Sequence, residues 1–577
     1  MSLRSVLLIV CTWIACLPGP VDRLSAAQKT VKDYGAIGDG ITDDSAAIQA
    51  ALNADNSVFL PPGVYRLGSR LTIARSQMSL IGAGPASTSL LIDEALKGGC
   101  LFVNGPSTLE DIEIRGLKVD GSKNPAQLIG MQILNARRVR LSQLTALDLS
   151  GLVHLEGVEN FQIHDIAGSN LIEFISMNTI RHGTISDIRV VGVDEGFDFF
   201  NCEDVAVSGA VLSAREPTVI KPAEWAVAVD LSSSRRISIT HCEFSGHHYS
   251  IKLKHDTEKV RGRPPVEDIL ISNCQLSDYK SAGIFFQVVE GRGCRVQNCE
   301  IRSTRAGSTG LYGFLPEKCQ LSDLVIADCS IDAVVHGIRL NRYEDLEIRG
   351  CRIRSKESHG VNLQSCAHPN ISSCRIHSPS DIAIMLADVD QPVVEDCYIA
   401  GVAGIWATNC SRPAVRGNHI PSALGRGITI EWTTDRGLDA FNRIAGFVVD
   451  ENTISNWGSA SAGNPAIALA FARTATGAYN AGSISGNRMI MSEDGKAMGQ
   501  CGIAKTPRFF LVSIAAVARH YARPRLSRLP PDHVVAVDRA LLRRVAASDR
   551  RFNHDSSRHV WMQRAEILIR AGRCERE

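Results

Sequence analysis

The chain has 577 residues, of which 44% are hydrophobic and 21% are charged, and its formal net charge is +1. This composition provides enough apolar surface for a large core, so it requires neither intrinsic disorder nor a fold that depends on disulfides. The near-zero net charge gives no sign of a nucleic-acid partner.

The N-terminus has the three parts of a secretory signal. Arg4 provides a basic start, an apolar run extends from Val6 to Leu17, and small residues follow at Ser25 and Ala27. The run is too short to cross a bilayer, and no later stretch is long and apolar enough to do so. We therefore expect residues 1–27 to be a signal peptide, the mature chain to have no transmembrane segment, and the protein to be secreted or periplasmic.

Residues 31–68 predict a capping segment that contains one helix. Thr42 and Asp43 are good N-cap residues, and Ile48, Ala51 and Leu52 would share one face of the helix that follows. A cap of this kind is needed where the first coil of a solenoid would otherwise expose strand edges and core.

An acidic cluster also lies in this segment, at Asp39, Asp43 and Asp44. Aspartate is a common turn and N-cap residue because its carboxylate accepts hydrogen bonds from nearby backbone N–H groups. We interpret the cluster as turn and cap chemistry in preference to a metal site.

Farther along the chain, the pattern aliphatic-x-x-Cys-x-aliphatic recurs, with asparagine in place of cysteine in the last three copies. The repeated position is occupied by Cys242, Cys274, Cys299, Cys329, Cys351, Cys374, Cys397, Asn418, Asn452 and Asn487. Short strands, in which inward and outward side chains alternate, lie between Gly, Ser, Asn and Asp turns. The shortest repeats have a length in the low twenties of residues. This combination indicates the coils of a solenoid.

Stacked coils lie ~4.8 Å apart, so one position per coil becomes a column of like side chains. Two of the 17 cysteines, Cys11 and Cys16, belong to the predicted signal. We expect most of the others to be buried free thiols, although the protein is exported, and the asparagines to hydrogen-bond along the stack. Closely spaced Cys-x-x-Cys pairs are absent, which disfavours a zinc site.

The repeat ends before residues 505–577, which contain one lysine and fifteen arginines against seven acidic residues. A basic arm for an anionic polymer or a membrane surface is one interpretation. The abrupt change in composition favours a poorly ordered extension that is foreign to the domain. We therefore divide the chain into a signal peptide at 1–27, a β-helix domain at 28–504 and a basic extension at 505–577.

The capping segment resembles a known family. Its sequence Asp33-Tyr-Gly-Ala-x-Gly-Asp-Gly-x-Thr-Asp-Asp44, with Pro61-Pro-Gly-x-Tyr65 after an Ala-rich helix, is similar to the opening of pectate-lyase-superfamily proteins. These include polygalacturonase-like and tailspike-like enzymes. The resemblance implies an all-β fold, a right-handed parallel β-helix with an N-terminal capping helix, and activity on a polysaccharide.

Residues 194–268 are the region where ionisable side chains gather on successive coils. Asp198 stands between Phe197 and Phe199, and because side chains alternate along a strand we expect Asp198 to point outward. The same alternation places Lys252 and Lys254 outward. Acid, histidine and lysine groups that share one outer face would suit either acid–base hydrolysis of a glycosidic bond or proton abstraction beside a uronate carboxylate.

The resemblance suggests roles for individual residues. Polygalacturonases carry Asn-Thr-Asp-Gly-Ile-Asp, Gly-Asp-Asp, Gly-His-Gly and Arg-Ile-Lys motifs, and residues 193–198, 223–225, 246–248 and 250–252 resemble them in part. We therefore predict catalytic roles for Glu195, Asp198, Glu224, His247 and Lys252. We predict substrate-binding roles for Asp194, Trp225, Asp230, His248, Lys254, Arg261 and Arg263. Trp225 replaces one acid of the Gly-Asp-Asp motif, which departs from the polygalacturonase mechanism.

The sequence thus predicts a glycan-cleaving enzyme, either a hydrolase or a β-eliminating lyase, whose substrate is a polysaccharide that includes acidic uronate units. The alternatives are a non-catalytic glycan-binding or cell-surface structural solenoid and an epimerase that acts on the polymer. We expect no cofactor, with Ca²⁺ entering only if the enzyme is a lyase. A homotrimer is compatible with this architecture but is not indicated. A second group of residues on neighbouring coils would extend the binding surface for an anionic chain: His336, Arg339, Asn341, Arg342, His359 and Asn362.

Overall fold

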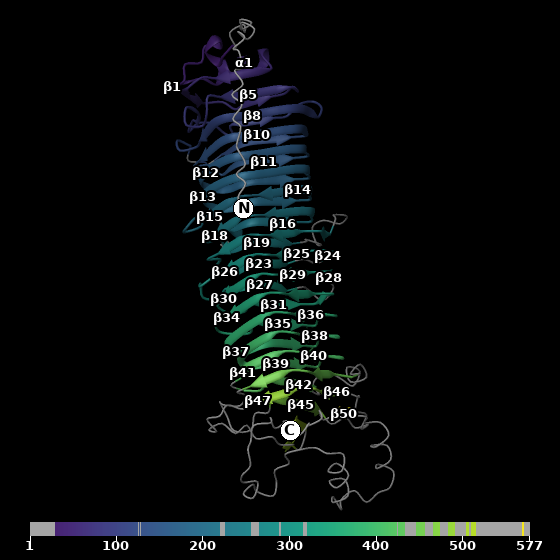
Figure 1. Ribbon diagram of the computed structural model, residues 1–577. Coiled ribbons are helices and arrows are strands. Elements are labelled where there is room, and N and C mark those ends of the chain that lie inside the picture. The colour runs from purple at the N-terminus through teal and green to yellow at the C-terminus, as the bar shows by residue number, and fades with distance from the viewer. Residues whose placement is uncertain are drawn as a thin grey trace, which may run out of the picture.

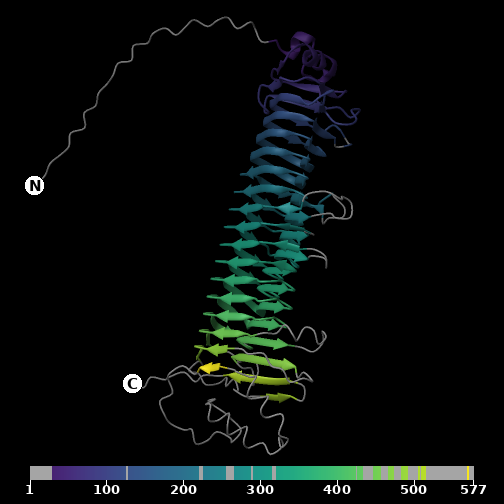
Figure 2. The same cartoon turned by 90° about the vertical axis from the view of Figure 1, so that its right-hand side faces the viewer.

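The structure is a computed structural model of the chain. It describes residues 29–490 apart from gaps at 125, 127, 220–224, 255–264, 288–289, 315–319, 424, 433–445, 456–465 and 473–482, and it also describes 504–506, 509–514 and 568–570. The predicted signal peptide at 1–27 lies outside the described residues. The described part is an elongated column of stacked coils with a small helical cap at its N-terminal end (Figures 1 and 2).

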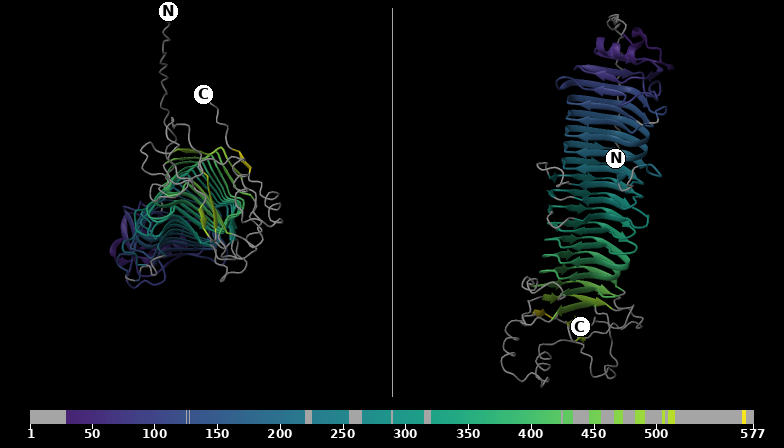
Figure 3. Two further views of the ribbon diagram at one scale, coloured as in Figure 1. Left: turned by 90° about the horizontal axis from the view of Figure 1, so that it is seen from below. Right: turned by 180° about the vertical axis from the view of Figure 1, so that it is seen from behind.

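The coils form a parallel β-helix with three walls, as the view along the column shows (Figure 3, left). Strands of successive coils pair in parallel and in register, so each wall is a sheet that runs the length of the column. Six long strands bend around a corner and belong to more than one wall. They are β8 (Leu109–Asp120), β10 (Ala136–Leu147), β12 (Glu159–Asn178), β13 (Arg181–Phe200), β37 (Arg375–Ala387) and β39 (Tyr398–Thr408).

One wall carries the candidate functional site and is called the site wall. It also includes shorter strands. They are β4 (Leu71–Ile73), β7 (Leu101–Val103), β9 (Ile129–Leu134), β11 (Gly151–Glu156), β16 (Val227–Ser232), β19 (Tyr249–Lys254), β23 (Ala282–Gln287), β27 (Thr309–Phe314), β31 (Ile338–Asn341), β35 (Val361–Gln364), β42 (Ile428–Trp432) and β45 (Ile467–Ala472).

The two other walls complete each coil. One contains β2 (Ser57–Leu60), β5 (Met78–Gly82), β14 (Glu203–Ser208), β17 (Arg235–Thr240), β20 (Val266–Glu267), β21 (Leu270–Ser272), β24 (Glu290–Arg292), β25 (Arg295–Gln297), β28 (Gln320–Ser322), β29 (Val325–Ala327), β32 (Tyr343–Glu344), β33 (Glu347–Arg349), β36 (Asn370–Ser372), β38 (Val393–Glu395), β40 (Ala414–Arg416), β43 (Val448–Asp450) and β46 (Ser483–Ser485). The other contains β1 (Asp39–Asp43), β3 (Gly63–Leu67), β6 (Thr88–Ile92), β15 (Val211–Ala214), β18 (Glu243–Ser245), β22 (Gln275–Ser277), β26 (Glu300–Arg302), β30 (Ser330–Ala333), β34 (Arg352–Ser355), β41 (His419–Ala423), β44 (Thr453–Ser455) and β47 (Arg488–Ile490).

The N-terminal cap consists of a 3-10 turn, η1 (Val31–Tyr34), and helix α1 (Ser45–Ala54). The predicted apolar face is confirmed, because Ile48, Ala51 and Leu52 are buried. The predicted N-cap residues are wrong by one or two residues, since the N-cap residue is Asp44 and not Asp43 or Thr42. The Asp44 side chain caps no helix N–H group and accepts instead from the backbone N–H groups of residues 37 and 38 at 2.7 and 3.1 Å.

The other two acids of the cluster serve the backbone, as predicted. Asp39 accepts hydrogen bonds from the N–H groups of Ile41 and Thr42, both at 2.8 Å. Asp43 accepts from the N–H group of Ser45 at 3.0 Å, at the start of the helix. The cluster therefore performs turn and cap chemistry.

Many corners of the coils depend on single residues in the left-handed backbone conformation. At one corner these residues include Asp187, His241, Asn273, Asp328 and Asp396, whose φ values lie between 53° and 55°. Asn and Asp tolerate this region better than most L-residues do, which explains their frequency immediately before the repeated cysteine or apolar residue. Each such residue lets the chain turn from one wall into the next within a single residue.

The predicted column of cysteines is confirmed. Strands β33, β36 and β38 pair in register, and Cys351, Cys374 and Cys397 follow them at equivalent positions. The Cys374 N–H group donates to Cys397 Sγ at 3.4 Å, so neighbouring members of the column are in contact. All twelve cysteines of the described residues are buried and free.

Asparagine continues the column toward the C-terminus. Asn418 Nδ2 donates to Asn452 Oδ1 at 2.9 Å, and Asn452 Nδ2 donates to Asn487 Oδ1 at 2.9 Å. Each amide also donates to a backbone carbonyl of the preceding coil, for example Asn452 to Val415 O at 3.0 Å. The buried amides therefore satisfy one another along the column axis.

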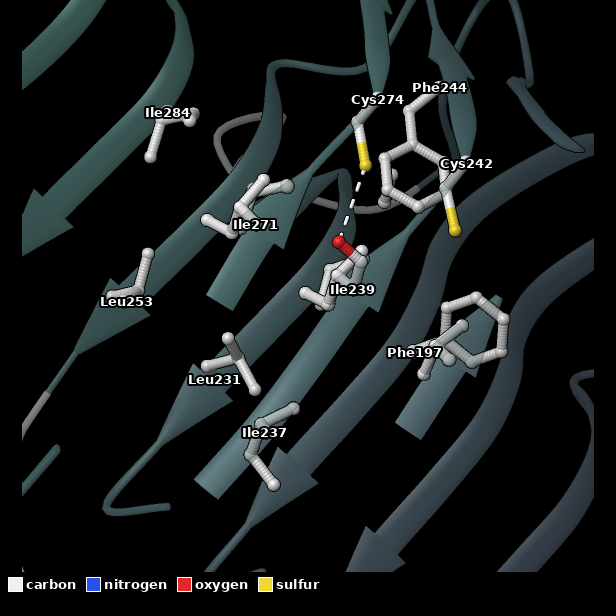
Figure 4. Close-up of a cluster of buried hydrophobic side chains, with 14 of the residues drawn as sticks. Phe197, Leu231, Ile237, Ile239, Cys242, Phe244, Leu253, Ile271, Cys274 and Ile284 are labelled. Carbon is white, nitrogen blue, oxygen red and sulfur yellow. Dashed lines mark hydrogen bonds between the residues drawn. The ribbon is translucent and has the colours of Figure 1, made fainter. Parts of the chain in front are cut away.

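The core is a continuous stack of inward-facing aliphatic, aromatic and cysteine side chains. Figure 4 shows one section, in which Phe197, Leu231, Ile239 and Cys274 from successive coils point into the same interior. All four are at least 99% buried. Because no coil could cover these side chains alone, stacking is the condition for a dry core.

The described part of the C-terminal region adds three strands. β48 (Ala504–Thr506) and β49 (Phe509–Ile514) pair antiparallel to each other, and β49 also runs antiparallel to β45. β50 (Leu568–Arg570) pairs in parallel with β46. The remainder of the predicted extension at 505–577 lies outside the described residues. No helix within the described ranges is long and apolar enough to cross a membrane.

Candidate functional site

Three carboxyl groups converge on the outer face of the site wall. Glu195 and Asp198 extend from β13, and Asp230 extends from β16, directly opposite Asp198 in the parallel register. One oxygen of each carboxyl group lies within 4.8 Å of the others. We call these three residues the acid centre. As predicted, Asp198 points outward, because its neighbours Phe197 and Phe199 are fully buried.

Gly196 enables this convergence, because it stands between the two acids of β13 where the strand passes close to the next coil. A Cβ atom at Gly196 would lie 2.2 Å from the carbonyl oxygen of Ala228 and 2.5 Å from Leu212 Cδ1. Real Cβ atoms do not approach other atoms so closely, so a larger residue at this position would push the two coils apart. The separation of Glu195 and Asp198 from Asp230 thus depends on a glycine at position 196.

Lys254 provides the positive charge of the site. Its Nζ donates a hydrogen bond to Asp230 Oδ2 at 2.6 Å, across the pair formed by β16 and β19. Asp230 is only 4% exposed, so this charge-assisted bond is shielded from water and is stronger than an exposed ion pair. Burial alone would lower the pKa of Lys254, but Asp230 outweighs it and the pKa is raised.

Burial and mutual repulsion keep the first two acids protonated to unusually high pH. Burial raises the pKa of Glu195 to about 8, with further increases from the charges of Asp198, Glu173 and Asp230. Burial, then the charge of Asp230, raises the pKa of Asp198 to about 7. Two neighbouring carboxyl groups with raised and unequal pKa values are the arrangement expected of an acid–base pair.

The acid centre also has the chemistry of a calcium site. Carboxylate oxygens are preferred ligands of Ca²⁺, and the separation of the three oxygens is compatible with Ca²⁺–oxygen distances of about 2.3–2.6 Å. Asp230 Oδ1 is buried without a hydrogen-bond partner and could act as a ligand. Lys254 already occupies the other oxygen of Asp230, so a bound cation would compete with its ammonium group.

Two residues predicted to contact substrate are buried instead. His247 is fully buried at the corner between β18 and β19, and burial followed by the charge of Lys280 lowers its pKa to about 3. Asp194 is also fully buried, where its Oδ2 lies 3.7 Å from Arg215 Nε. The structure therefore places both residues in the interior of the corners, where neither is exposed to a ligand on the outer face.

The other described candidates lie on or beside the wall. Lys252 is in register with Asp230, and its Nζ lies 5.8 Å from the centre of the Tyr249 ring. His248 contacts the same ring edge-on, with ring centroids 4.6 Å apart. Trp225 is 55% exposed just before β16. Glu224, Arg261 and Arg263 lie outside the described residues, so their predicted roles remain predictions.

The structure adds functional candidates that sequence reasoning missed. Glu173 on β12 is in register with Glu195, and its charge raises the pKa of Glu195. The sequence signal that could have identified Glu173 was its distance from Glu195, which equals one repeat. An aromatic stack follows beyond Lys252, where the rings of Tyr249 and Phe285 are 4.7 Å apart and those of Phe285 and Tyr312 are 5.3 Å apart. Because these rings face one another, they present edges to a ligand.

A hollow elsewhere on the surface, near the N-terminal cap, is lined by residues that include Gly82, Arg115 and Asp165. It extends along the column as far as β12, but it lies at the corner between the two other walls and not on the site wall. Asp165 is the only acid among the residues that line it. The candidate site is therefore the acid centre on the site wall.

Family comparisons agree with the fold. Residues 29–243 match the family described as rhamnogalacturonase A/epimerase, pectate lyase-like, and residues 317–464 match the family described as right-handed beta helix region. The first match includes Glu195, Asp198 and Asp230.

Curated relatives match over shorter stretches. Alginate lyase 7 of Azotobacter vinelandii is 38% identical over 112 residues, which are 17% of this chain and 13% of that protein. Mannuronan C5-epimerase AlgE6 of the same organism is 37% identical over 108 residues, 16% of this chain and 12% of that protein. The chain therefore spans less than a fifth of the length of these relatives.

Structurally similar solved proteins include two that act on polysaccharides. The A-module of Azotobacter vinelandii mannuronan C-5 epimerase AlgE6 is 15% identical, with a TM-score of 0.28 over 80% of this chain and 98% of that one. The family 28 exopolygalacturonase of Yersinia enterocolitica is 14% identical, with a TM-score of 0.34 over 62% of this chain and 75% of that one.

Proposed function

We propose that this chain, a right-handed parallel β-helix protein of the pectate-lyase superfamily, is a secreted enzyme that hydrolyses glycosidic bonds of a polysaccharide at the acid centre. The observation that carries the proposal is the convergence of Glu195, Asp198 and Asp230 on one outer face. Glycoside hydrolysis needs one protonated carboxyl group to donate to the leaving oxygen and one carboxylate to act on water or on the sugar. The acid centre supplies both.

The environments of the acids suggest their roles. Glu195 has the higher pKa, about 8, so it stays protonated at neutral pH and is the proton donor in the proposal. Asp198 ionises at lower pH and is the carboxylate that activates water or attacks the sugar. Asp230 is almost fully buried and held by Lys254, so it acts as a positioning residue that keeps the pKa values of its neighbours raised.

The proposed substrate is a polysaccharide with acidic uronate units. Lys252 and Lys254 lie immediately beside the acid centre on β19, and cations at this position would bind the carboxylate of a sugar next to the scissile bond. The names of the curated relatives, an alginate lyase and mannuronan epimerases, support the same class of polymer.

A second candidate is β-elimination or epimerisation of a uronate polymer, which those relatives favour directly. In this case Glu195, Asp198 and Asp230 would hold Ca²⁺, which supplies positive charge to a sugar carboxylate. Lys252 would then be the candidate base for the proton beside that carboxylate.

The experiment is incubation of the purified mature protein with neutral and uronate-containing polysaccharides, with and without EDTA. Reducing ends without unsaturated uronate absorbance, in the presence of EDTA, are the expected result. If reducing ends and unsaturated uronate absorbance appear together, are lost with EDTA and are restored by Ca²⁺, the enzyme is a lyase and not a hydrolase. Changed sugar configuration without scission, read by NMR, would indicate an epimerase, and binding without any reaction would indicate a glycan-binding solenoid.

A further inference from the structure

The outward ionisable side chains of the site wall change from acidic to basic along the column. On the N-terminal side the wall carries five outward acids, namely Glu156, Glu173, Glu195, Asp198 and Asp230, beside the inward and buried Asp194. The segments that form this part of the wall, β9, β11, residues 171–178 of β12, residues 193–200 of β13, and β16, contain no lysine or arginine.

Beyond the acid centre the pattern is the opposite. The five strands β19, β23, β27, β31 and β35 contain no aspartate or glutamate at all. They carry three cations, Lys252, Lys254 and Arg339. The parallel register places Lys252, Phe285, Tyr312 and Arg339 in one file along the wall.

Arg339 lies at the far end of this file. Its guanidinium carbon is 5.9 Å from the centre of the Tyr312 ring, which orients it above the last ring of the aromatic stack. In the part of the chain that the structure describes, no carboxylate forms an ion pair with Arg339. The next coil presents the amides of Asn362 and Gln364, which are suited to carboxylate and hydroxyl groups.

Two histidines border Arg339 on the same wall. The rings of His336 and His359 are 5.6 Å apart, and His359 Nδ1 lies 3.0 Å from Asp381 Oδ2. Burial lowers the pKa of both, that of His336 to about 4, so both are neutral at neutral pH. Asp381 accepts a hydrogen bond from Ser358 Oγ at 3.3 Å, and the two neutral histidines add no charge beside Arg339.

We infer that the site wall binds an acidic polysaccharide with fixed polarity, its carboxylates lying over β19 to β35, with Arg339 as a remote anchor for one of them. Five steps of the register separate Asp198 from Arg339, which at ~4.8 Å per step is about 24 Å. A chain of several sugar units is needed to span that length. The inference rests on the proposed function in that the same wall holds the substrate.

Electrostatics explains why the acidic stretch of the polymer lies on the side of β19 to β35. A sugar carboxylate over the acid centre would meet Asp230 and partly ionised Asp198, and like charges in a partly buried site repel strongly. The same carboxylate over β19 or β31 would meet an ammonium or guanidinium group. The reacting bond therefore lies at the boundary, and the acidic stretch of the polymer extends toward β35.

The test compares binding of uronate oligomers of two lengths to the full mature chain. Calorimetry uses a trimer and a decamer of galacturonate and of mannuronate, with a neutral glucan oligomer as reference. All variants carry E195Q, so that slow cleavage does not disturb the titration. We expect the decamer to bind more tightly than the trimer, and R339Q to weaken the decamer about tenfold or more while leaving the trimer unchanged.

R352Q is the matched control, because Arg352 is an exposed arginine on β34 in a different wall. Unchanged decamer binding in R339Q, equal affinity for trimer and decamer, equal affinity for the neutral glucan, or absence of any uronate binding would each overturn the inference. Arg339-dependent binding by a protein that cleaves no polysaccharide would support the inference while refuting the proposed hydrolysis.

Discussion

At the scale of single residues, the pKa values of the acid centre set a pH window for catalysis. Asp198 must be ionised and Glu195 protonated, and their pKa values are raised to about 7 and about 8. The two groups interact, so these values describe the pair as it titrates. We expect a bell-shaped profile of kcat/KM with its maximum between pH 7 and pH 8.

Two variants should shift that profile in opposite directions. Asp230 raises the pKa of both acids, so D230N is expected to move both limbs to lower pH. Lys254 lowers both pKa values, so K254Q is expected to move both limbs to higher pH. Measurement of kcat/KM from pH 4 to pH 10 checks this, and shifts in the same direction for both variants would contradict the assignment.

The raised pKa of Glu195 also affects stability. An unfolded glutamate titrates near pH 4.3, so the folded state favours the protonated form, and stability falls as pH rises from there to about 8. Replacing the acid by an amide removes this loss. We expect E195Q to be less active but more stable than wild type at pH 9, by roughly 3–5 kcal/mol, in urea denaturation. Equal stability at pH 5 and pH 9 in wild type would refute the burial of this charge.

Sequence reasoning located part of the site at this scale. The alternation around Asp198 and around Lys252 placed both correctly outward, because buried neighbours on either side leave no choice. His247 and Asp194 were predicted from the motif resemblance and not from alternation, and both are fully buried at corners. The sequence predicted a substrate-binding role for Asp230, and the structure places its carboxyl group beside those of Glu195 and Asp198.

At the scale of the elements, the two kinds of column residue should differ in their contribution to stability. Asn452→Ala removes bonds to Asn418, Asn487 and Val415 and leaves their buried polar groups unpaired. We expect a loss of about 2–4 kcal/mol. Cys374→Ala removes one sulfur atom and weak S–H bonds, for which we expect about 1 kcal/mol. Denaturant titrations measure both, and equal losses would contradict the role of the amides.

The spacing of the coils explains why the neighbours of the acid centre could not be read from sequence. Register pairs Asp230 with Lys252 after 22 residues but Asp198 with Asp230 after 32 and Lys252 with Phe285 after 33. Loops between strands lengthen some coils and leave the stacked strands unchanged. A constant period predicts the column of Cys351, Cys374 and Cys397, whereas it cannot align the irregular coils around the site.

At the scale of the whole molecule, stacking buries the thiols and should make them inert. Burial raises the pKa of Cys100, Cys294 and Cys410 to about 12 in each case, so their reactive thiolate form is scarce at neutral pH. We expect the twelve described cysteines to resist a thiol reagent such as DTNB in the native protein and to react in guanidinium chloride. Rapid native reaction of these cysteines, mapped by mass spectrometry, would show that the column is open.

The whole-molecule claim is that stacked coils bring acids from different parts of the chain into one reactive centre. D198N tests it most directly, with D187N as a matched control on the same strand, where Asp187 is an exposed corner residue. Reducing-end release from a uronate-containing polysaccharide should fall by about 10²–10⁴-fold in D198N and remain at the wild-type rate in D187N, with both variants folded. Full activity of D198N would contradict the account.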